Sequence, residues 1–530
     1  MSVLLHQSTD LPSIEGEWVW FAITGTSANL DPKHKLLNLG QRLEETFDDI
    51  RDDWWALGHK LGQTPSARLA HMPTAASYNC DFGLMMAWSR LTEAVASAPV
   101  RCLVVCDDPW IFRQLASIKG VEAGQAPPLF PQLLKRWTRG WFARVKLTIS
   151  VIVAHIRLRK SRANNVQGTN TLLVYGHPGS NTEGHDAYFG SLMDDMPALG
   201  RMVHTDGDVN LTLELAKDGR TAGLHAWGSI LFAPFLFFQR WQPGPSDLEG
   251  PYNWILRRAV TFENATAAPA ANYWQMHCQE RWLKSQRPKT VVWPWENHPW
   301  EREFCRSAKR QHIKTRGYQH AVIGPHQFNP GPASNPDGLT SIPDRIICSG
   351  PAYHDQLLTW GIPTDQLCIG GAFRISRFDG NYYDADGPVF VATSSFAPIT
   401  EQMMLAVQSA VKPGRKFIVK IHPLYPQNIK ETENISLTNH TIPEQQGLSA
   451  VFYGTGTSGL EGLLAGVPTF RFRPDDRVAI NVLPEGAKAE PVSIDTLGNA
   501  LDQAKIPDPL NWESIYSPVD QALWQKELNT

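Results

Sequence analysis

The residues best suited to chemistry lie close together in one short stretch near the C-terminal end. The stretch reads Val451-Phe-Tyr-Gly-Thr-Gly-Thr-Ser-Gly-Leu-Glu461, which predicts a buried strand, a tight turn and a helix. Backbone N–H groups at a helix N-terminus favour an anion. The hydroxyls of Thr457 and Ser458, on either side of the turn into Gly459, add donors for phosphate oxygens. Glu461, one turn into the helix, can accept hydrogen bonds from ribose hydroxyls.

A second apolar strand upstream also ends in polar side chains. It runs Lys416-Phe-Ile-Val-Lys420 and leads into His422 and Pro423. Two strand ends of this kind, close together in an open α/β sheet, form a nucleotide-binding crevice. We therefore predict that Lys420, His422 and Pro423 share one nucleotide site with the turn at 457–461. An ordinary strand–turn–helix whose glycines serve packing is the alternative interpretation.

The Lys-x-His-Pro strand end followed by a Thr-Ser-Gly-x-Glu helix resembles the C-terminal domain of two-domain (GT-B) glycosyltransferases. It is most similar to bacterial capsule and lipopolysaccharide enzymes that use CMP-activated sugars, the Kdo and sialic acid transferases. In those enzymes the His-Pro and Ser/Thr motifs hold the CMP. The resemblance implies an α/β fold with two Rossmann-like domains, whose parallel sheets face a central cleft.

Two further segments extend this resemblance. One is Trp293-Pro-Trp-Glu296-Asn-His-Pro-Trp-Glu301, followed by a strand that ends in Gln319-His320; the other is Asp186-Ala-Tyr-Phe-Gly190. They are similar to the Glu-Asn/Gly-Gln-x-Trp-Glu, Gln-His and Asp-x-Tyr-Phe-Gly elements of bacterial surface-carbohydrate transferases. The chain departs from the pattern at His298, where Gln is usual. The resemblance spans residues 172–475, and residues 1–160 match no family.

Glycosyl transfer needs a base or nucleophile near the anomeric carbon and stabilisation of charge on the leaving phosphate. The sequence favours Asp186 as the reacting carboxylate, because it lies in a Gly-rich loop after the strand predicted at 171–175; an Asx-turn residue is the alternative. Glu296 is the next candidate, as a base or acceptor ligand. His320 is the third, as an acid or a ligand of sugar hydroxyls. Glu301 is expected to be the N-terminal charge of the following helix. A nucleophilic carboxylate would give retention and a base would give inversion; both stay open.

The donor phosphate has a further candidate ligand in Arg374. This residue follows the Gly370-Gly371 turn and can pair bidentately with a phosphate or a sugar carboxylate; a surface arginine is the alternative. Because CMP leaves with one phosphate, Lys420, His422 and the Ser/Thr hydroxyls can suffice without a metal. We therefore expect a metal-independent enzyme without a cofactor, which takes a CMP-sugar donor and a glycan or lipid-linked acceptor.

The length and composition of the chain limit the classes of protein to which it can belong. A chain of 530 residues is too long for one compact core, so two large α/β domains are expected. The net charge of −3 argues against a general nucleic-acid binder. Seven scattered cysteines indicate reduced thiols rather than a disulfide framework. The N-terminus has no secretory pattern and no window is long and apolar enough for a membrane span, so a cytoplasmic protein is predicted.

The segment from Gly124 to Thr182 contains no Asp or Glu and carries nine Lys or Arg residues. Its basic residues alternate with apolar ones and with Trp137 and Trp141, which predicts an amphipathic helical segment at 131–162. Such a helix can lie on the anionic inner-membrane surface, where each basic residue adds roughly 1 kcal/mol. A helix packed on its own domain with a solvated basic face is the other interpretation.

Strand-like and helical runs alternate on both sides of a Pro-, Gly- and Asn-rich segment at 325–341, which we interpret as part of a crossover between domains. This predicts an N-terminal acceptor-binding domain at 1–340 and a C-terminal nucleotide-sugar-binding domain at 341–510. A helix at 511–530 is expected to pack back on the first domain. The aromatic run at 224–241 is interpreted as a buried helix.

Three other functions stay open at this stage. A CDP-glycerol glycerophosphotransferase would use a similar C-terminal domain, but the segments around Glu296 and Asp186 favour a sugar transferase. A UDP- or GDP-sugar donor is equally compatible with the fold. A non-catalytic glycan- or membrane-binding assembly protein is the third, and the retained Lys420, His422 and Ser458 argue against it.

Overall fold

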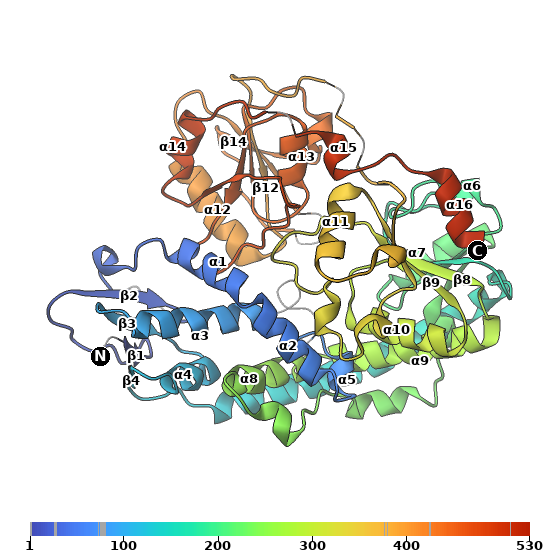
Figure 1. Ribbon diagram of the computed structural model, residues 1–530, viewed down its shortest axis with the longest axis horizontal. Helices are drawn as coiled ribbons and strands as arrows, with labels where there is room; N and C mark the ends of the chain where they lie inside the picture. Colours follow the sequence, from blue (N-terminus) through green and yellow to red (C-terminus); the bar gives the residue numbers. More distant parts are fainter. Residues whose placement is uncertain are drawn as a thin grey trace.

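The computed structural model describes residues 3–25, 29–72, 74, 81–375, 377–378, 380–422, 426–508 and 510–529. Within these residues the chain forms three β-sheets, and every pairing between their strands is parallel. Figure 1 shows a small sheet at one end of the molecule, a large sheet at the other and a third sheet above them. The predicted α/β architecture with two Rossmann-like parallel sheets is confirmed, and a third sheet is added to it.

The small sheet belongs to the N-terminal region that resembles no family. Its strand order is β2-β3-β1-β4, with β1 (Val3–His6), β2 (Trp18–Ala22), β3 (Arg101–Val105) and β4 (Val121–Ala123). The accompanying helices are α1 (Leu39–Asp49), α2 (Arg51–Leu61), α3 (Phe82–Ala96) and α4 (Pro109–Ala116). Glu44 on α1 pairs with Arg471 and Arg473 (2.6 Å to the latter), which ties this region to the C-terminal sheet.

The large sheet has seven strands in the order β11-β10-β9-β8-β5-β6-β7. They are β5 (Thr171–Val174), β6 (Gly200–Val203), β7 (Thr221–Gly223), β8 (Thr290–Pro294), β9 (Lys314–Gln319), β10 (Arg345–Cys348) and β11 (Leu367–Ile369). Its helices include α6 (Leu192–Asp195), α7 (Val209–Leu215), α8 (Asn253–Asn264), α9 (Ala268–Gln286), α10 (Pro299–Arg310) and α11 (Pro351–Thr359). Strands buried on both faces, as here, are typical of parallel sheets.

The boundary expected at 340/341 does not coincide with the change of sheet. β10 pairs with β9 (Arg345 opposite Arg316) and β11 pairs with β10, so both strands belong to the large sheet. The intervening segment at 325–341 is packed rather than linker-like. Ser334 and Asn335 are fully buried, and their side chains bond to Arg302 (3.0 Å) and Asn297 (3.2 Å). Its irregular composition reflects these specific contacts, and the chain leaves the large sheet only after β11.

The third sheet has six strands in the order β14-β13-β12-β15-β16-β17. They are β12 (Val389–Ala392), β13 (Phe417–Lys420), β14 (Ile435–Thr438), β15 (Ala450–Tyr453), β16 (Thr469–Phe472) and β17 (Glu490–Val492). Its helices are α12 (Ala397–Ser409), α13 (Ser458–Leu464) and α14 (Leu497–Asp502). The strand–turn–helix expected from the 451–461 stretch is therefore β15 followed by α13.

The C-terminal tail returns to the large sheet through α15 (Trp512–Ile515) and α16 (Gln521–Asn529). Trp524 of α16 is fully buried against Phe189 and Tyr318. Glu527, also buried, pairs with Arg316 at 2.8 Å and Arg345 at 2.7 Å. The tail thus closes the large sheet beside β8–β10.

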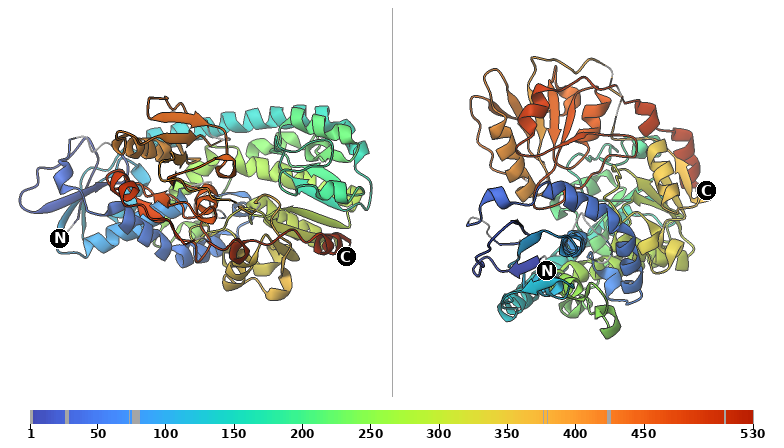
Figure 2. Two further views of the ribbon diagram at one scale, coloured as in Figure 1. Left: turned by 90° about the horizontal axis from the view of Figure 1, so that it is seen from above. Right: turned by 60° about the vertical axis from the view of Figure 1, so that its left-hand side comes forward.

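Two apolar segments lie along one edge of the molecule. The basic segment forms one long helix, α5 (Phe130–Leu158), visible along the upper edge of Figure 2, left. The buried helix expected at 224–241 is wrong: the segment forms two 3-10 turns, η5 (Leu224–Trp227) and η6 (Ala233–Phe238). Extended Gly228 separates them, and the Trp274 ring occupies the space a Cβ would need there.

Candidate functional site

Four neighbouring strands of the large sheet place polar or aromatic side chains at their carboxyl ends. Tyr175 follows β5, His204 follows β6, Glu296 lies two residues beyond β8, and His320 follows β9. Because carboxyl ends of parallel strands meet at one edge, these residues converge. The Tyr175 ring lies 5.0 Å from the His204 ring, and the Tyr175 hydroxyl accepts a hydrogen bond from Trp300 Nε1 (3.2 Å).

Glu296 is the centre of this edge. One carboxylate oxygen lies 2.7 Å from His298 Nε2 and the other lies 3.8 Å from His320 Nε2. Its side chain keeps 34% exposure, so one face stays open to a ligand. Burial by itself would raise its pKa, but the hydrogen bond with His298 and the positive charges of His298, His320 and Arg374 outweigh burial and lower the pKa to about 2. Glu296 is therefore anionic at neutral pH.

The pKa values of the two histidines beside Glu296 are shifted in opposite directions. Burial lowers the pKa of His298, but the hydrogen bond and charge of Glu296 outweigh it and the net pKa is raised. Burial lowers the pKa of His320 to about 4, and the more distant Glu296 only partly opposes this. The site thus combines a carboxylate, a histidine that favours the charged form and a histidine that is neutral at pH 7.

The loop that carries Glu296 is held by a buried acid in the next helix. Glu301, in the first turn of α10, accepts hydrogen bonds from the backbone N–H groups of Glu296 (3.0 Å) and Asn297 (3.1 Å) and from Trp293 Nε1 (3.0 Å). Burial raises its pKa to about 7. Asn297 adopts a left-handed conformation (φ 59°), which turns the chain sharply after Glu296. The expected role of Glu301 at the start of its helix agrees with these contacts.

Asp186 occupies a structural position. It is fully buried, lies 3.7 Å from Arg201 Nη1 of β6 and accepts hydrogen bonds from Ser180 Oγ (3.2 Å) and Tyr188 N (2.9 Å). The bond to Tyr188 N, two residues ahead, is that of an Asx turn. With no exposed surface, the carboxylate cannot reach a substrate in this structure. Of the two predicted carboxylates, Glu296 therefore has the exposed face and Asp186 does not.

At the six-stranded sheet the predicted donor ligands are only partly buried. Lys420 ends β13, His422 follows it and donates its backbone N–H to Thr393 Oγ1 (3.0 Å), and Thr457 and Ser458 begin α13. Burial lowers the pKa of Lys420 and of His422. Burial raises the pKa of Glu461, against the opposing charge of Lys420. The charges of Lys420 and Glu461 thus interact, a shared nucleotide crevice stays a prediction, and Pro423 lies outside the described residues.

The glycines of this turn serve packing. A Cβ on Gly459 would lie 2.2 Å from Cζ of Tyr453, and one on Gly462 would lie 2.6 Å from Thr469 Oγ1. These contacts let α13 sit directly on β15 and β16. Because α13 has only seven residues, its side chains matter more than its dipole. Gly459 is thus explained without a ligand, as the alternative interpretation had it.

Arg374 links the two sheets. It lies in the loop after β11, is exposed, and its guanidinium carbon lies 5.7 Å from the centre of the Tyr188 ring. Its charge lowers the pKa of Glu296 at the large sheet and of Glu461 at the six-stranded sheet. The exposed guanidinium fits both sequence interpretations, a donor ligand and a surface arginine.

The loops beyond the strands bring the two edges together. After β9, His326 Nδ1 lies 2.9 Å from the backbone nitrogen of Asn481, which lies in the loop between β16 and β17. Gly324 approaches the same loop so closely that a Cβ would lie 2.4 Å from the Asn481 carbonyl oxygen. The loops that follow β9 and β16 thus pack against each other.

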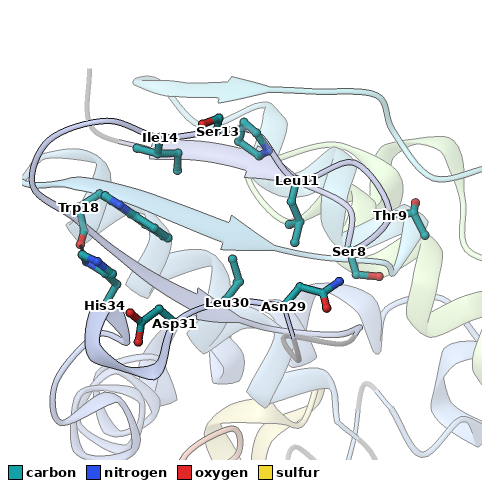
Figure 3. A pocket seen from close by; sticks show the side chains of 11 residues that line it. Ser8, Thr9, Leu11, Ser13, Ile14, Trp18, Asn29, Leu30, Asp31 and His34 are labelled. Carbon is teal, nitrogen blue, oxygen red and sulfur yellow. Dashed lines mark hydrogen bonds between the residues drawn. The ribbon is translucent and has the colours of Figure 1, made fainter.

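A separate pocket of about 550 Å³ lies at the small sheet (Figure 3). It is lined by Ser8, Asn29, Asp31 and neighbouring residues, and Trp18 stacks on His34 with ring centres 4.7 Å apart. None of the predicted site residues lines this pocket. Among the described residues, no three His, Cys, Asp or Glu side chains are grouped to hold a metal ion.

No protein-family model and no curated protein matches this chain. Solved structures with some similarity include the UDP-GlcNAc 2-epimerase from Neisseria meningitidis bound to UDP-GlcNAc (10% identity, 68% of this chain and 99% of that chain, TM-score 0.39). The glycosyltransferase SnogD from Streptomyces nogalater (13%, 68% and 96%, TM-score 0.38) and the glycotransferase of kitacinnamycin (12%, 68% and 95%, TM-score 0.38) are others. The fold of this chain is therefore defined by its three parallel sheets and their strand orders.

Proposed function

We propose that this chain is a glycosyltransferase that takes a sugar from a CMP-activated donor and adds it to a lipid-linked or capsular or lipopolysaccharide glycan. The sugar proposed is a 2-keto acid of the Kdo or sialic type. The observation that carries the proposal is the Glu296 carboxylate at the carboxyl edge of the large sheet, which lies 2.7 Å from His298 Nε2 and 3.8 Å from His320 Nε2 and keeps an exposed face. A donor bound at the six-stranded sheet would then present its sugar to the large sheet.

The donor side supplies charges that suit one phosphate and one sugar carboxylate. Lys420 is a point charge at the end of β13, and Arg374 can bind a carboxylate or phosphate through two N–H groups. The hydroxyls of Thr457 and Ser458 add donors, and Glu461 can accept from the ribose. Two cations match the charge of CMP as a leaving group better than that of a nucleoside diphosphate, which supports a CMP-sugar donor.

The reacting side is supplied by Glu296 and its histidines. In the transfer, the bond between the anomeric carbon and the phosphate oxygen breaks, and a bond to the acceptor oxygen forms. Lys420 and Arg374 stabilise the charge left on the phosphate. Glu296, anionic at neutral pH, is placed to stabilise positive charge at the anomeric carbon or to take the acceptor proton. The neutral His320 is a second proton acceptor within the same site.

The test is isothermal titration of the protein with CMP, CDP, UDP and GDP in EDTA. The proposal predicts that CMP binds most tightly and that EDTA leaves its affinity unchanged. Tighter binding of CDP would favour a CDP-glycerol enzyme, and tighter binding of UDP or GDP would favour a conventional nucleotide-sugar transferase. No binding of any of the four would contradict the proposal and favour a non-catalytic assembly protein.

A further inference from the structure

Helix α5 exposes large apolar side chains over much of its length. It rests on the protein through a narrow face that includes Arg144, Thr148, Val151 and Leu158. On its free side, Phe142 is 74% exposed and Trp137 is 56% exposed. Further exposed apolar residues are Phe130, Leu133, Leu134, Trp141, Ile149, Val153 and Ile156. An exposed apolar surface of this extent marks an interaction site.

The exposed residues of α5 form two adjoining stripes. Phe142, Ile149, Val153 and Ile156 recur at intervals of seven, four and three residues, which places them on one helix face. The exposed basic residues Lys135, Arg139, Lys146 and Arg157 recur at intervals of four, seven and eleven, and form a second stripe next to the first. An apolar stripe bordered by cations is the pattern of a helix that lies in a membrane interface.

A second segment extends the apolar surface beside α5. The loop and 3-10 turn around η6 expose Leu231 (85%), Phe238 (76%) and Phe235. This segment is fixed to α5, because the Phe237 ring lies 5.4 Å from the Trp141 ring and its carbonyl oxygen accepts from Arg144 Nε at 3.1 Å. Because the sequence predicted a buried helix at 224–241, this exposed apolar surface was not expected.

Charge identifies the partner of this surface. Neither segment carries a carboxylate: Asp and Glu are absent from 124–182 and from 219–246, although the whole chain has a net charge of −3. A two-fold interface between two copies would place the basic stripe against itself, which like charges disfavour. We infer that α5 and the segment at 230–238 form one docking surface for a lipid bilayer with anionic headgroups. Among the described residues no helix is long and apolar enough to cross a membrane, so the surface docks in the plane of the bilayer.

This inference stands apart from the proposed nucleotide chemistry, because lipid binding is measured without substrate. The experiment is flotation of the full-length protein with vesicles of phosphatidylcholine alone and of phosphatidylcholine mixed with phosphatidylglycerol. The protein should float with the mixed vesicles at least tenfold better than with phosphatidylcholine alone, and added salt should release it. Phe235→Ser/Phe238→Ser and Lys135→Glu/Arg139→Glu/Lys146→Glu should each reduce flotation at least tenfold.

Two control variants change exposed residues elsewhere. Leu405→Ser/Ile506→Ser removes exposed apolar side chains, and Lys488→Glu/Lys505→Glu reverses exposed charges. Both should float like the wild type, and the circular dichroism spectrum and thermal unfolding of every variant report whether the fold is intact. Failure of the wild type to float with either vesicle, or equal flotation by the patch variants and the wild type, would overturn the inference. So would a dimer in sedimentation that Phe235→Ser/Phe238→Ser dissolves, because a second copy would then cover the surface.

Discussion

The two sheet edges that carry the predicted site residues are built in different ways. At the large sheet, Glu296 is fixed by His298 at 2.7 Å, and its loop is held by the fully buried Glu301. At the six-stranded sheet, Lys420 and Ser458 are half-buried and are placed by a strand end and a seven-residue helix. The edge of the large sheet is preorganised through buried hydrogen bonds, whereas the edge of the six-stranded sheet presents partly exposed side chains.

This difference indicates a division of labour. Groups that act on a reacting atom need fixed geometry, which second contacts provide. Groups that bind a nucleotide need accessible donors and acceptors. We therefore expect changes at the first edge to affect turnover and stability, and changes at the second edge to affect nucleotide affinity. Arg374, whose charge acts on acids at both edges, should affect both turnover and nucleotide affinity.

The largest effect is expected from Glu296→Gln. Removal of the negative charge takes away both the proton acceptor and the stabilisation of positive charge, so kcat for release of CMP from a CMP-sugar should fall roughly a thousandfold. Binding of CMP should stay within about twofold, since Glu296 lies on the other sheet. Glu280→Gln, at a partly exposed position on α9 that pairs with Arg310, is the matched control. Wild-type turnover in the Glu296 variant would remove this carboxylate from the reaction.

Asp186→Asn should affect stability. Asp186 lies 3.7 Å and Asp218 lies 3.0 Å from the fully buried Arg201, so the variant removes one of the two acids that neutralise this guanidinium. We expect the free energy of unfolding to fall by about 3 kcal/mol, measured by urea denaturation. The folded fraction should keep its turnover. Asp355→Asn, at an exposed aspartate, should cost little. A stable variant without turnover would return Asp186 to the reaction.

Arg374→Ala and Lys420→Ala should each weaken CMP binding by about tenfold to a hundredfold, because each removes a charge-assisted hydrogen bond to the phosphate. Arg374→Lys should recover part of the affinity, since it keeps the charge and loses the second N–H contact. Arg377→Ala, three residues along the same loop, is the control. Isothermal titration measures all four variants, and unchanged affinity in both alanine variants would contradict the assigned donor site.

A smaller effect concerns pH and the buried His225 beyond β7. Its Nδ1 accepts from Trp274 Nε1 at 2.9 Å, and burial lowers its pKa to about 4. The unfolded chain binds this proton near the ordinary pKa of 6.5, so His225 lowers the free energy of unfolding as the pH falls from about 6.5 to about 4. Glu301 acts in the opposite direction, because its pKa is raised from 4.5 to about 7. It increases the free energy of unfolding as the pH falls from about 7 to about 4.5.

Comparison of the wild type with His225→Gln separates the contribution of His225 to the pH dependence from that of Glu301. The acid-dependent loss of stability in urea should be smaller in the variant by on the order of 2 kcal/mol. An equal loss in both proteins would show that His225 does not contribute.

Much of the fold could be predicted from the sequence, because strands such as 171–174 and 450–453 are short apolar runs buried on both faces. The assignment of β10 to the large sheet could not, since strand pairing is a long-range property and the segment before it looks like a linker. In the site, Glu296 and His320 were found by motif. The pairing of His298 with Glu296 was signalled only by the departure from the family pattern.

Two contacts of the predicted site residues depend on long-range placement. Asp186 was favoured because it follows a strand in a Gly-rich loop, but its partner Arg201 lies on another strand and no local pattern reveals it. Arg374 lies 5.7 Å from the Tyr188 ring, a contact that the sequence near residue 374 does not encode. Local patterns thus identified residue types well and their partners poorly.

The most direct test of the central claim is titration of CMP into the wild type, His422→Ala and Glu296→Gln under identical conditions. The division between the two edges predicts that His422→Ala binds CMP at least tenfold more weakly, about 1.4 kcal/mol, while Glu296→Gln binds it as the wild type does. Equal weakening in both variants, or wild-type affinity in His422→Ala, would contradict the assignment of nucleotide binding to the six-stranded sheet.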